Sequence, residues 1–273
     1  MLRKIFYLLP PSWRHTLRWI VYFPQDIFSA KNQLAPPSRL IYTGRGDFIK
    51  QGEEWLDFFI NQASLKSSDT VLDIGSGIGR IALPLTHFLQ APYEGFDAVQ
   101  TGVDWCTANI TSRRPHFRFQ YFPLHNDLYN QSSLKASQFV FPYTQHEFDF
   151  ACAISVFTHM LPDEIENYFS QMDRVLKPGA TAVCTFFILN AESIKSMNNQ
   201  KGGFKFILSD HKPYALLNEK VKAANVAYRE NYVDKILADH SFNIISKIPG
   251  HWCGREKSNS LAFQDIWILN KKQ

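Results

Sequence analysis

Long apolar runs are missing from the sequence, and so are dense clusters of basic residues. No apolar run reaches the length of a membrane-spanning helix. The stretch Ile5–Leu9 is too short, and too soon interrupted by Pro10 and Pro11, for the core of a secretory leader. The net charge is only +4 and no stripe of lysine and arginine occurs, so no nucleic-acid partner is expected. These absences predict a cytoplasmic protein.

Cysteine is scarce as well, and no two cysteines stand in a C-x-x-C spacing. The four residues are scattered along the chain: Cys106, Cys152, Cys184 and Cys253. The pattern excludes a disulfide framework and a zinc site of the usual spacing, so no metal is expected. With 273 residues, of which 45% are hydrophobic and 20% charged, the chain is predicted to hold one α/β domain with additions.

The first forty residues differ in character from the rest. Ser12 is a candidate cap for a helix over Trp13–Phe23, which carries apolar residues on one face and basic residues opposite. Three interpretations stay open: the helix packs on the main domain, contacts a membrane surface, or binds a partner. Pro36 and Pro37 then form a linker. We therefore predict a basic amphipathic helical extension over residues 1–40 and a main domain over residues 41–273.

The main domain is organised around residues 70–80. A short apolar run over residues 70–74 predicts a buried strand, glycines follow at every second position, and a helical pattern begins at Ile81. This order opens a Rossmann-like unit, in which backbone N–H groups face a ligand. A dinucleotide site would need its third glycine at the position of Arg80. Asp73 would also repel a pyrophosphate, and would attract a cation such as a methionine ammonium group.

The pattern D-x-G-x-G-x-G at residues 73–79 resembles motif I of class I S-adenosylmethionine (SAM)-dependent methyltransferases. Asp97 after the second strand, Phe148 and Asp149 opening the fourth, and the run Arg174–Gly179 extend the resemblance over about residues 50–270. It implies a Rossmann-like α/β fold with a seven-stranded, mostly parallel sheet. Helices should cover both faces, and an antiparallel C-terminal hairpin should close the sheet.

The resemblance also implies which residues contact the cofactor S-adenosyl-L-methionine. Asp97, about twenty residues past the glycine loop, suits the ribose hydroxyl pair. Asp127 and Leu128 match the adenine site by position, and Ser155 follows the fourth strand, where the methyl group is transferred. The full predicted set is Asp73, Gly75, Ser76, Gly77, Gly79, Arg80, Asp97, Asp127, Leu128 and Ser155.

The remaining pattern predicts the other elements of this fold. Helices are expected over residues 53–65, 80–90, 99–113, 162–176 and 228–240. Further strands are expected over residues 93–97, 117–122, 148–155, 180–189, 242–249 and 263–269. An irregular insertion at about 190–227 typically shapes an acceptor pocket in this fold.

Methyl transfer to a hydroxyl requires alignment of the two reactants and uptake of a proton. His159, after the fourth strand, is the best-placed base, and His125 is the second candidate. His251 and Tyr42 follow, and a packing role for His159 is the alternative. Tyr42, Arg45 and Asp47 lie ahead of motif I and are candidates for substrate or cofactor contacts, or else form a solvent-exposed turn.

The acceptor is predicted to be a small molecule, with oxygen as the favoured atom. The Asn/Asp-Pro-Pro-Tyr run typical of enzymes that methylate base or amide nitrogens is missing after the fourth strand. An aromatic content of 15% favours a pocket with apolar walls. Two alternatives remain: an NAD(P)-dependent oxidoreductase, which Asp73 disfavours, and a non-catalytic binding or membrane-adaptor protein on the same fold. The oligomeric state is not predicted.

Overall fold

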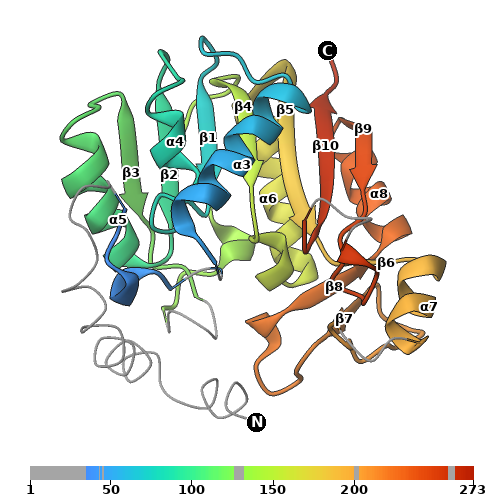
Figure 1. The fold of residues 1–273 in the computed structure, drawn as a ribbon. Coiled ribbons are helices and arrows are strands. Elements are labelled where there is room, and N and C mark those ends of the chain that lie inside the picture. Colours follow the sequence, from blue (N-terminus) through green and yellow to red (C-terminus); the bar gives the residue numbers. More distant parts are fainter. Residues whose placement is uncertain (1–34, 43, 45, 126–131, 200–202, 258–261) are drawn as a thin grey trace. The chain divides into compact units, whose positions relative to one another are not determined.

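The computed structural model describes residues 35–42, 44, 46–125, 132–199, 203–257 and 262–273 (Figure 1). They divide into two compact units, the first ending at Ser132 and the second beginning at Ser133. The predicted helix Trp13–Phe23 lies outside the described residues, and its role and the proposed domain boundary stay predictions. No helix in the described part of the chain is long and apolar enough to cross a membrane.

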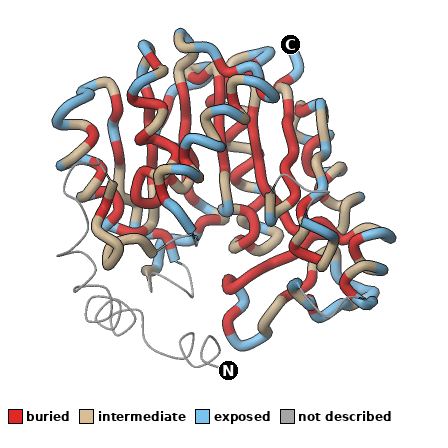
Figure 2. Tube along the Cα trace, viewed as in Figure 1, coloured by how far each residue is buried: buried red, intermediate tan, exposed pale blue. Residues whose placement is uncertain are grey.

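The seven-stranded sheet of the predicted fold class is confirmed, with strand order β3-β2-β1-β4-β5-β10-β9. The first unit contributes three parallel strands, β1 (Val71–Ile74), β2 (Tyr93–Asp97) and β3 (Phe117–Tyr121). In the second unit β4 (Phe148–Ala153) runs parallel to β5 (Leu176–Phe186). The antiparallel C-terminal hairpin consists of β9 (Phe242–Ile248) and β10 (Asp265–Lys271), and β10 also pairs with β5. Buried residues line most of these strands (Figure 2).

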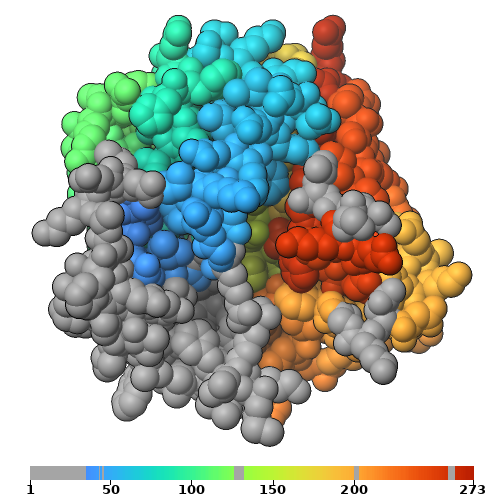
Figure 3. Space-filling model, in the orientation of Figure 1, coloured from blue at the N-terminus to red at the C-terminus, as the bar shows by residue number. Residues whose placement is uncertain are grey.

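Two helices of the first unit differ from their predicted bounds. Helix α3 spans Phe48–Asn61 and begins five residues earlier than expected, because the Asp47 carboxylate caps it by accepting the Lys50 N–H at 3.0 Å. It lies at the surface of its unit (Figure 3). The predicted helix over 80–90 is reduced to α4, Ala82–Leu85. Pro84 has no N–H to donate, and the Thr86 hydroxyl bonds the Leu83 carbonyl at 2.6 Å.

The predicted helix over 99–113 is confirmed in place but is not uniform. Helix α5 spans Gln100–Cys106 and continues as η2, a π-helical segment over Thr107–Thr111. Such widened turns break the regular hydrogen-bond ladder locally. Cys106 at the junction is buried, and a Cβ added to Gly79 would lie 2.8 Å from its sulfur. The close approach of α5 therefore requires glycine at position 79.

An aromatic stack forms the core of the second unit and anchors the turn after β4. Phe157, in the 3₁₀ turn η4 (Phe157–His159), stacks on Phe169 at 4.9 Å and on Phe186 at 5.3 Å between ring centroids. Phe169 belongs to α6 (Pro162–Val175), which matches its predicted bounds closely. All three rings are fully buried. The turn that carries the predicted base is thus fixed to the core by its first residue.

The strand predicted over 180–189 proves to be two strands in different sheets. β5 already begins at Leu176 and passes through Pro178 and Gly179, with a register shift opposite β4. It ends at Phe186, and the next residues form β6 (Ile188–Leu189). β6 belongs to a separate three-stranded sheet with β7 (Tyr214–Leu216) and β8 (Val226–Arg229).

The insertion over 190–227 is therefore more regular than expected. It contains helix α7 (Ala191–Asn199) and two short 3₁₀ or strand segments ahead of β8. Tyr228 and Arg229 pair with β6, so the predicted helix over 228–240 begins only at Glu230, as α8 (Glu230–Asp239). The small sheet packs around Trp252, which is fully buried beside Phe187 and Phe206.

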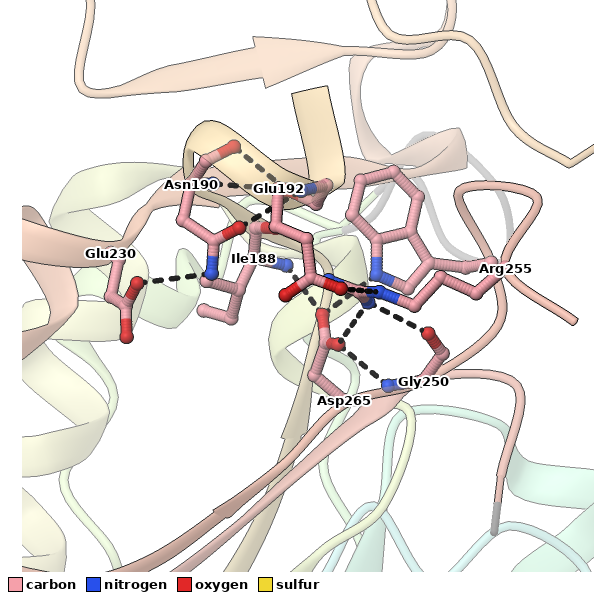
Figure 4. Close-up of polar contacts among 9 residues, drawn as sticks. Ile188, Asn190, Glu192, Glu230, Gly250, Arg255 and Asp265 are labelled. Atoms are coloured by element: carbon pink, nitrogen blue, oxygen red, sulfur yellow. Dashed lines mark hydrogen bonds and ion pairs between the residues drawn. The ribbon is translucent and has the colours of Figure 1, made fainter. Parts of the chain in front are cut away.

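One buried carboxylate ties the small sheet to β10 (Figure 4). Asp265 is 4% exposed and accepts hydrogen bonds from the Ile188 N–H, the Gly250 N–H and the Trp252 indole Nε1–H, each at 2.7 Å. The Arg255 guanidinium lies 3.7 Å away. Burial raises the pKa of Asp265 to about 6, although these donors favour its ionised form.

We expect Asp265→Ala to lower the free energy of unfolding by about 2–4 kcal/mol, because three buried N–H donors lose their acceptor. Urea unfolding followed by circular dichroism measures the loss. Asp234→Ala is the matched control, since its carboxylate is 42% exposed and pairs with Lys247 at the surface; it should cost less than about 1 kcal/mol. Equal losses in the two variants would contradict a central role for Asp265.

Candidate functional site

The glycine loop that follows β1 adopts a backbone that requires glycine. Gly75, Gly77 and Gly79 have φ values of 74°, 58° and 79°, in the left-handed region. The N–H groups of Gly75 and Ser76 both donate to the Phe96 carbonyl, at 2.9 and 3.0 Å. These two hydrogen bonds hold the loop against the carboxyl end of β2. The alternating glycines of the sequence motif reflect this conformation.

Asp97, at the end of β2, is the best-defined polar group of the loop. Its Oδ2 accepts the Gly77 N–H at 2.8 Å, and its Oδ1 accepts the Val99 N–H at 2.8 Å. The Tyr42 hydroxyl donates to Oδ1 at 3.4 Å, which shows that a hydroxyl reaches this carboxylate. Burial raises the pKa of Asp97 to about 6, against the effect of these donors. The arrangement suits hydroxyl groups that donate to a fixed carboxylate.

Two further polar groups lie at the end of β1. Asp73 is 1% exposed and accepts a hydrogen bond from the Tyr93 hydroxyl. Ser76 is also buried, and its Oγ has no hydrogen-bond partner among the described residues. Because buried hydroxyls are normally satisfied, the Ser76 hydroxyl is suited to a bound ligand or water.

Arg80 contacts the segment that precedes the loop. Its guanidinium donates to the Gln51 side-chain oxygen and lies 5.1 Å from the centre of the Phe48 ring. A Cβ added to Gly44 would collide with the same guanidinium. Burial lowers the pKa of Arg80. In this structure Arg80 contacts Gly44 and the first turns of α3, and its role as a cofactor residue stays a prediction.

Ser155 of the second unit lies two residues after the end of β4 and has a strained backbone conformation. Its φ is 62°, which is uncommon for a residue with a Cβ. Its N–H donates to the Thr185 hydroxyl at 2.7 Å, and its exposed hydroxyl donates to Oε1 of Gln264 at 3.0 Å. Strained residues of this kind concentrate at functional sites.

His159, four residues further on, is held in one tautomer. Its Nδ1 lies 2.8 Å from the carbonyl oxygen of Ala223, in the turn η5 (Lys222–Ala224). A carbonyl only accepts, so Nδ1 carries the proton and the neutral ring has its lone pair on Nε2. The Tyr228 hydroxyl donates to the neighbouring Met160 carbonyl at 2.5 Å. The insertion thus orients a histidine that is equipped to accept a proton.

The other predicted residues are distributed as follows. His125 is exposed, with Nδ1 3.1 Å from the Ser132 carbonyl, and belongs to the first unit. His251 has a buried Nδ1 without a hydrogen-bond partner in the described chain, and its ring lies 5.3 Å from that of Phe263. Three predicted residues lie outside the described residues: Arg45, Asp127 and Leu128. Within the described ranges no group of three metal-ligating side chains occurs.

The sequence did not reveal the residues that orient Ser155 and His159. Thr185, Ala223 and Gln264 lie 30, 64 and 109 positions away from their partners. Nothing local marks a backbone carbonyl or a single glutamine as a positioning group. The only available signal was the pair Gln264 and Asp265 itself, a glutamine beside a carboxylate at the start of an apolar strand.

Comparison with known proteins agrees with the observed fold. Residues 72–184 match a family model described as a methyltransferase domain. The chain shares its fold with the PH0226 protein of Pyrococcus horikoshii (15% identity, 85% of this chain and 95% of that chain, TM-score 0.58). It also resembles a SAM-dependent methyltransferase of Methanosarcina mazei (19% identity, 78% and 97%, TM-score 0.53). A third similar structure is the geranyl diphosphate C-methyltransferase of Streptomyces coelicolor (12% identity, 82% and 79%, TM-score 0.51), in complex with Mg²⁺, geranyl diphosphate and S-adenosylhomocysteine.

The residues present fit SAM as the cofactor. Asp97 offers a carboxylate to hydroxyl donors, and the unsatisfied Ser76 hydroxyl offers a further polar contact. The left-handed glycines keep side chains away from the loop backbone, which leaves it open to a ligand. We expect Asp97, Ser76 and the loop over 75–79 to hold the cofactor.

The affinity for S-adenosylhomocysteine should rise with pH between 5 and 7. The pKa of Asp97 is raised to about 6, so a proton competes with hydroxyl donors below that value. If only the ionised carboxylate binds, affinity at pH 5 should be about tenfold below its plateau. Calorimetry across this range measures the profile. Asp97→Asn should bind more weakly with a flat profile; an unchanged slope in that variant would assign the titration elsewhere.

Proposed function

We propose that the chain is a class I SAM-dependent methyltransferase that methylates an oxygen atom of a small-molecule acceptor. The observation that carries this proposal is the tautomer of His159. Its Nδ1–H is held by the Ala223 carbonyl, so that Nε2 accepts the proton that an attacking hydroxyl must lose.

In this proposal the protein contributes alignment and proton transfer. When bound, SAM would supply a methyl group on a positively charged sulfur, and that sulfur would leave as a neutral thioether. The acceptor oxygen forms the new bond to carbon while its proton moves to Nε2 of His159. The resulting imidazolium keeps its hydrogen bond from Nδ1 to Ala223, so the ring does not need to turn. Positioning the two reactants in line provides most of the remaining rate enhancement.

The composition of the second unit supports a small acceptor with apolar parts. Four aromatic residues in and around the small sheet pack against one another, edge to face except for the tilted pair Phe187 and Phe206: Phe187, Phe204, Phe206 and Trp252. The ring of Phe263 lies 5.1 Å from that of Phe204, measured between centroids, and so joins this cluster. Phe263 is 38% exposed and Ile207 is 50% exposed. The buried rings form a core, and the exposed side chains of Phe263 and Ile207 are the apolar groups that we propose for contact with an acceptor. The similar Streptomyces enzyme has a small acceptor in its complex.

A screen with labelled SAM and a panel of phenols, alcohols, carboxylic acids and amines tests the acceptor class. We expect label only on oxygen acceptors, and a pH–rate profile that rises through a pKa near neutrality. Transfer mainly to nitrogen or carbon would contradict the proposal.

For the best acceptor, His159→Asn should lower turnover by about 10²–10⁴-fold, because an amide donates to Ala223 but is a poor base. The affinity for S-adenosylhomocysteine should change less than about twofold, since His159 is proposed to act on the acceptor. His146→Asn is the matched control: His146 also bonds a backbone carbonyl through Nδ1, at 3.1 Å from Leu176, and should retain activity. Full turnover in His159→Asn would leave His159 with a packing role only.

A further inference from the structure

The turn after β4 is held in its conformation by hydrogen bonds from outside the turn. Ser155 occupies the left-handed region, which costs free energy for a residue with a Cβ. Its N–H bonds the Thr185 hydroxyl of the neighbouring strand β5. That hydrogen bond fixes the backbone N–H of Ser155 but leaves its side chain unconstrained.

Gln264 supplies the missing constraint with both ends of its carboxamide. Oε1 accepts the Ser155 hydroxyl at 3.0 Å, and Nε2 lies 3.5 Å from the hydroxyl oxygen of Thr158, to which it donates. Thr158 is fully buried and directly precedes His159. A single side chain therefore spans the turn from its strained first residue to the neighbour of the histidine.

Gln264 is itself held rigidly by its neighbours. Asp265, the next residue, carries the buried hydrogen-bond network of Figure 4. Gly250 donates to Asp265 at 2.7 Å, and a Cβ added to Gly250 would collide with the backbone of Gln264. The backbone of Gln264 thus has little freedom, and the position of its carboxamide depends on the Asp265 network.

We propose that Gln264 is a positioning residue, which locks the turn Ser155–His159 in the conformation required for cofactor and acceptor binding. It acts through Ser155, a predicted cofactor residue, and through Thr158 on His159. The role assigned to His159 rests on the proposed function, whereas the link from Gln264 to the turn does not. Loss of the carboxamide should release Ser155 from its strained backbone and let the His159 ring exchange between tautomers.

Two measurements on the full chain test this inference. Imidazole nitrogen-15 NMR reports the His159 tautomer, and calorimetry reports the affinity for S-adenosylhomocysteine. In Gln264→Ala we expect the His159 signals to move from the pure Nδ1–H form towards the average of two tautomers, and the affinity to fall by about 5–20-fold. The melting temperature should stay close to that of the exposed-residue control Gln138→Ala, which should leave both other readouts unchanged.

The conservative variant Gln264→Glu keeps an acceptor for the Ser155 hydroxyl and should restore at least half of the lost affinity above pH 7. Ser155→Ala should also weaken binding, and the loss in the double variant should be smaller than the sum of the two single losses, because both changes remove the bond between Ser155 and Gln264. Unchanged His159 signals and affinity in Gln264→Ala, or additive losses in the double variant, would overturn the inference. If the wild-type protein does not bind S-adenosylhomocysteine, the proposed function fails, and the NMR signals alone decide the role of Gln264.

Discussion

The hydrogen bonds from backbone N–H groups to the carboxylate of Asp97 are the constraint on which the first unit depends. They connect the glycine loop after β1 with the start of α5 after β2, and so join two crossover units at the carboxyl ends of their strands. Because two oxygens are each fixed by one N–H at 2.8 Å, the carboxylate cannot rotate. Its remaining lone pairs therefore point in defined directions, which a ligand with two adjacent hydroxyls can use.

The second unit also contains a buried carboxylate that accepts hydrogen bonds from backbone N–H groups, here that of Asp265. Asp265 collects two backbone N–H groups and one indole N–H and thereby joins β6, β10 and the loop around Trp252. A buried carboxylate with several donors is rigid in a way that an apolar contact is not, because each donor prescribes a direction. Asp265 is adjacent in the chain to Gln264, whose side chain accepts the Ser155 hydroxyl. In both units a buried acid orders the backbone around it.

The local part of this organisation could be predicted from the sequence. The glycine motif, Asp97 and the order of strands and helices follow from patterns only a few residues long. The errors have long-range causes. β5 begins at Leu176 because Leu176 pairs with Phe148 of β4, ahead of the register shift at Pro178 and Gly179, and β6 leaves the main sheet because β8 pairs with it. The short α4 has a local cause in Pro84, which has no N–H to donate within the predicted helix over 80–90. Contacts such as Ser155 with Gln264 join residues 109 positions apart, beyond any local pattern.

Burying the two acids has a cost that depends on pH. Both carboxyl groups have pKa values of about 6, against a usual 3.8, so the folded chain binds their protons more tightly than the unfolded chain does. Each group therefore contributes about 3 kcal/mol of stability below pH 4, and this contribution is lost as the pH rises through 6. At neutral pH the fold carries two ionised, desolvated carboxylates that packing elsewhere must offset. A diol that donates hydrogen bonds to the ionised carboxylate of Asp97 would offset part of this loss in the free energy of unfolding. Ligand binding is thereby coupled to the stability of the first unit.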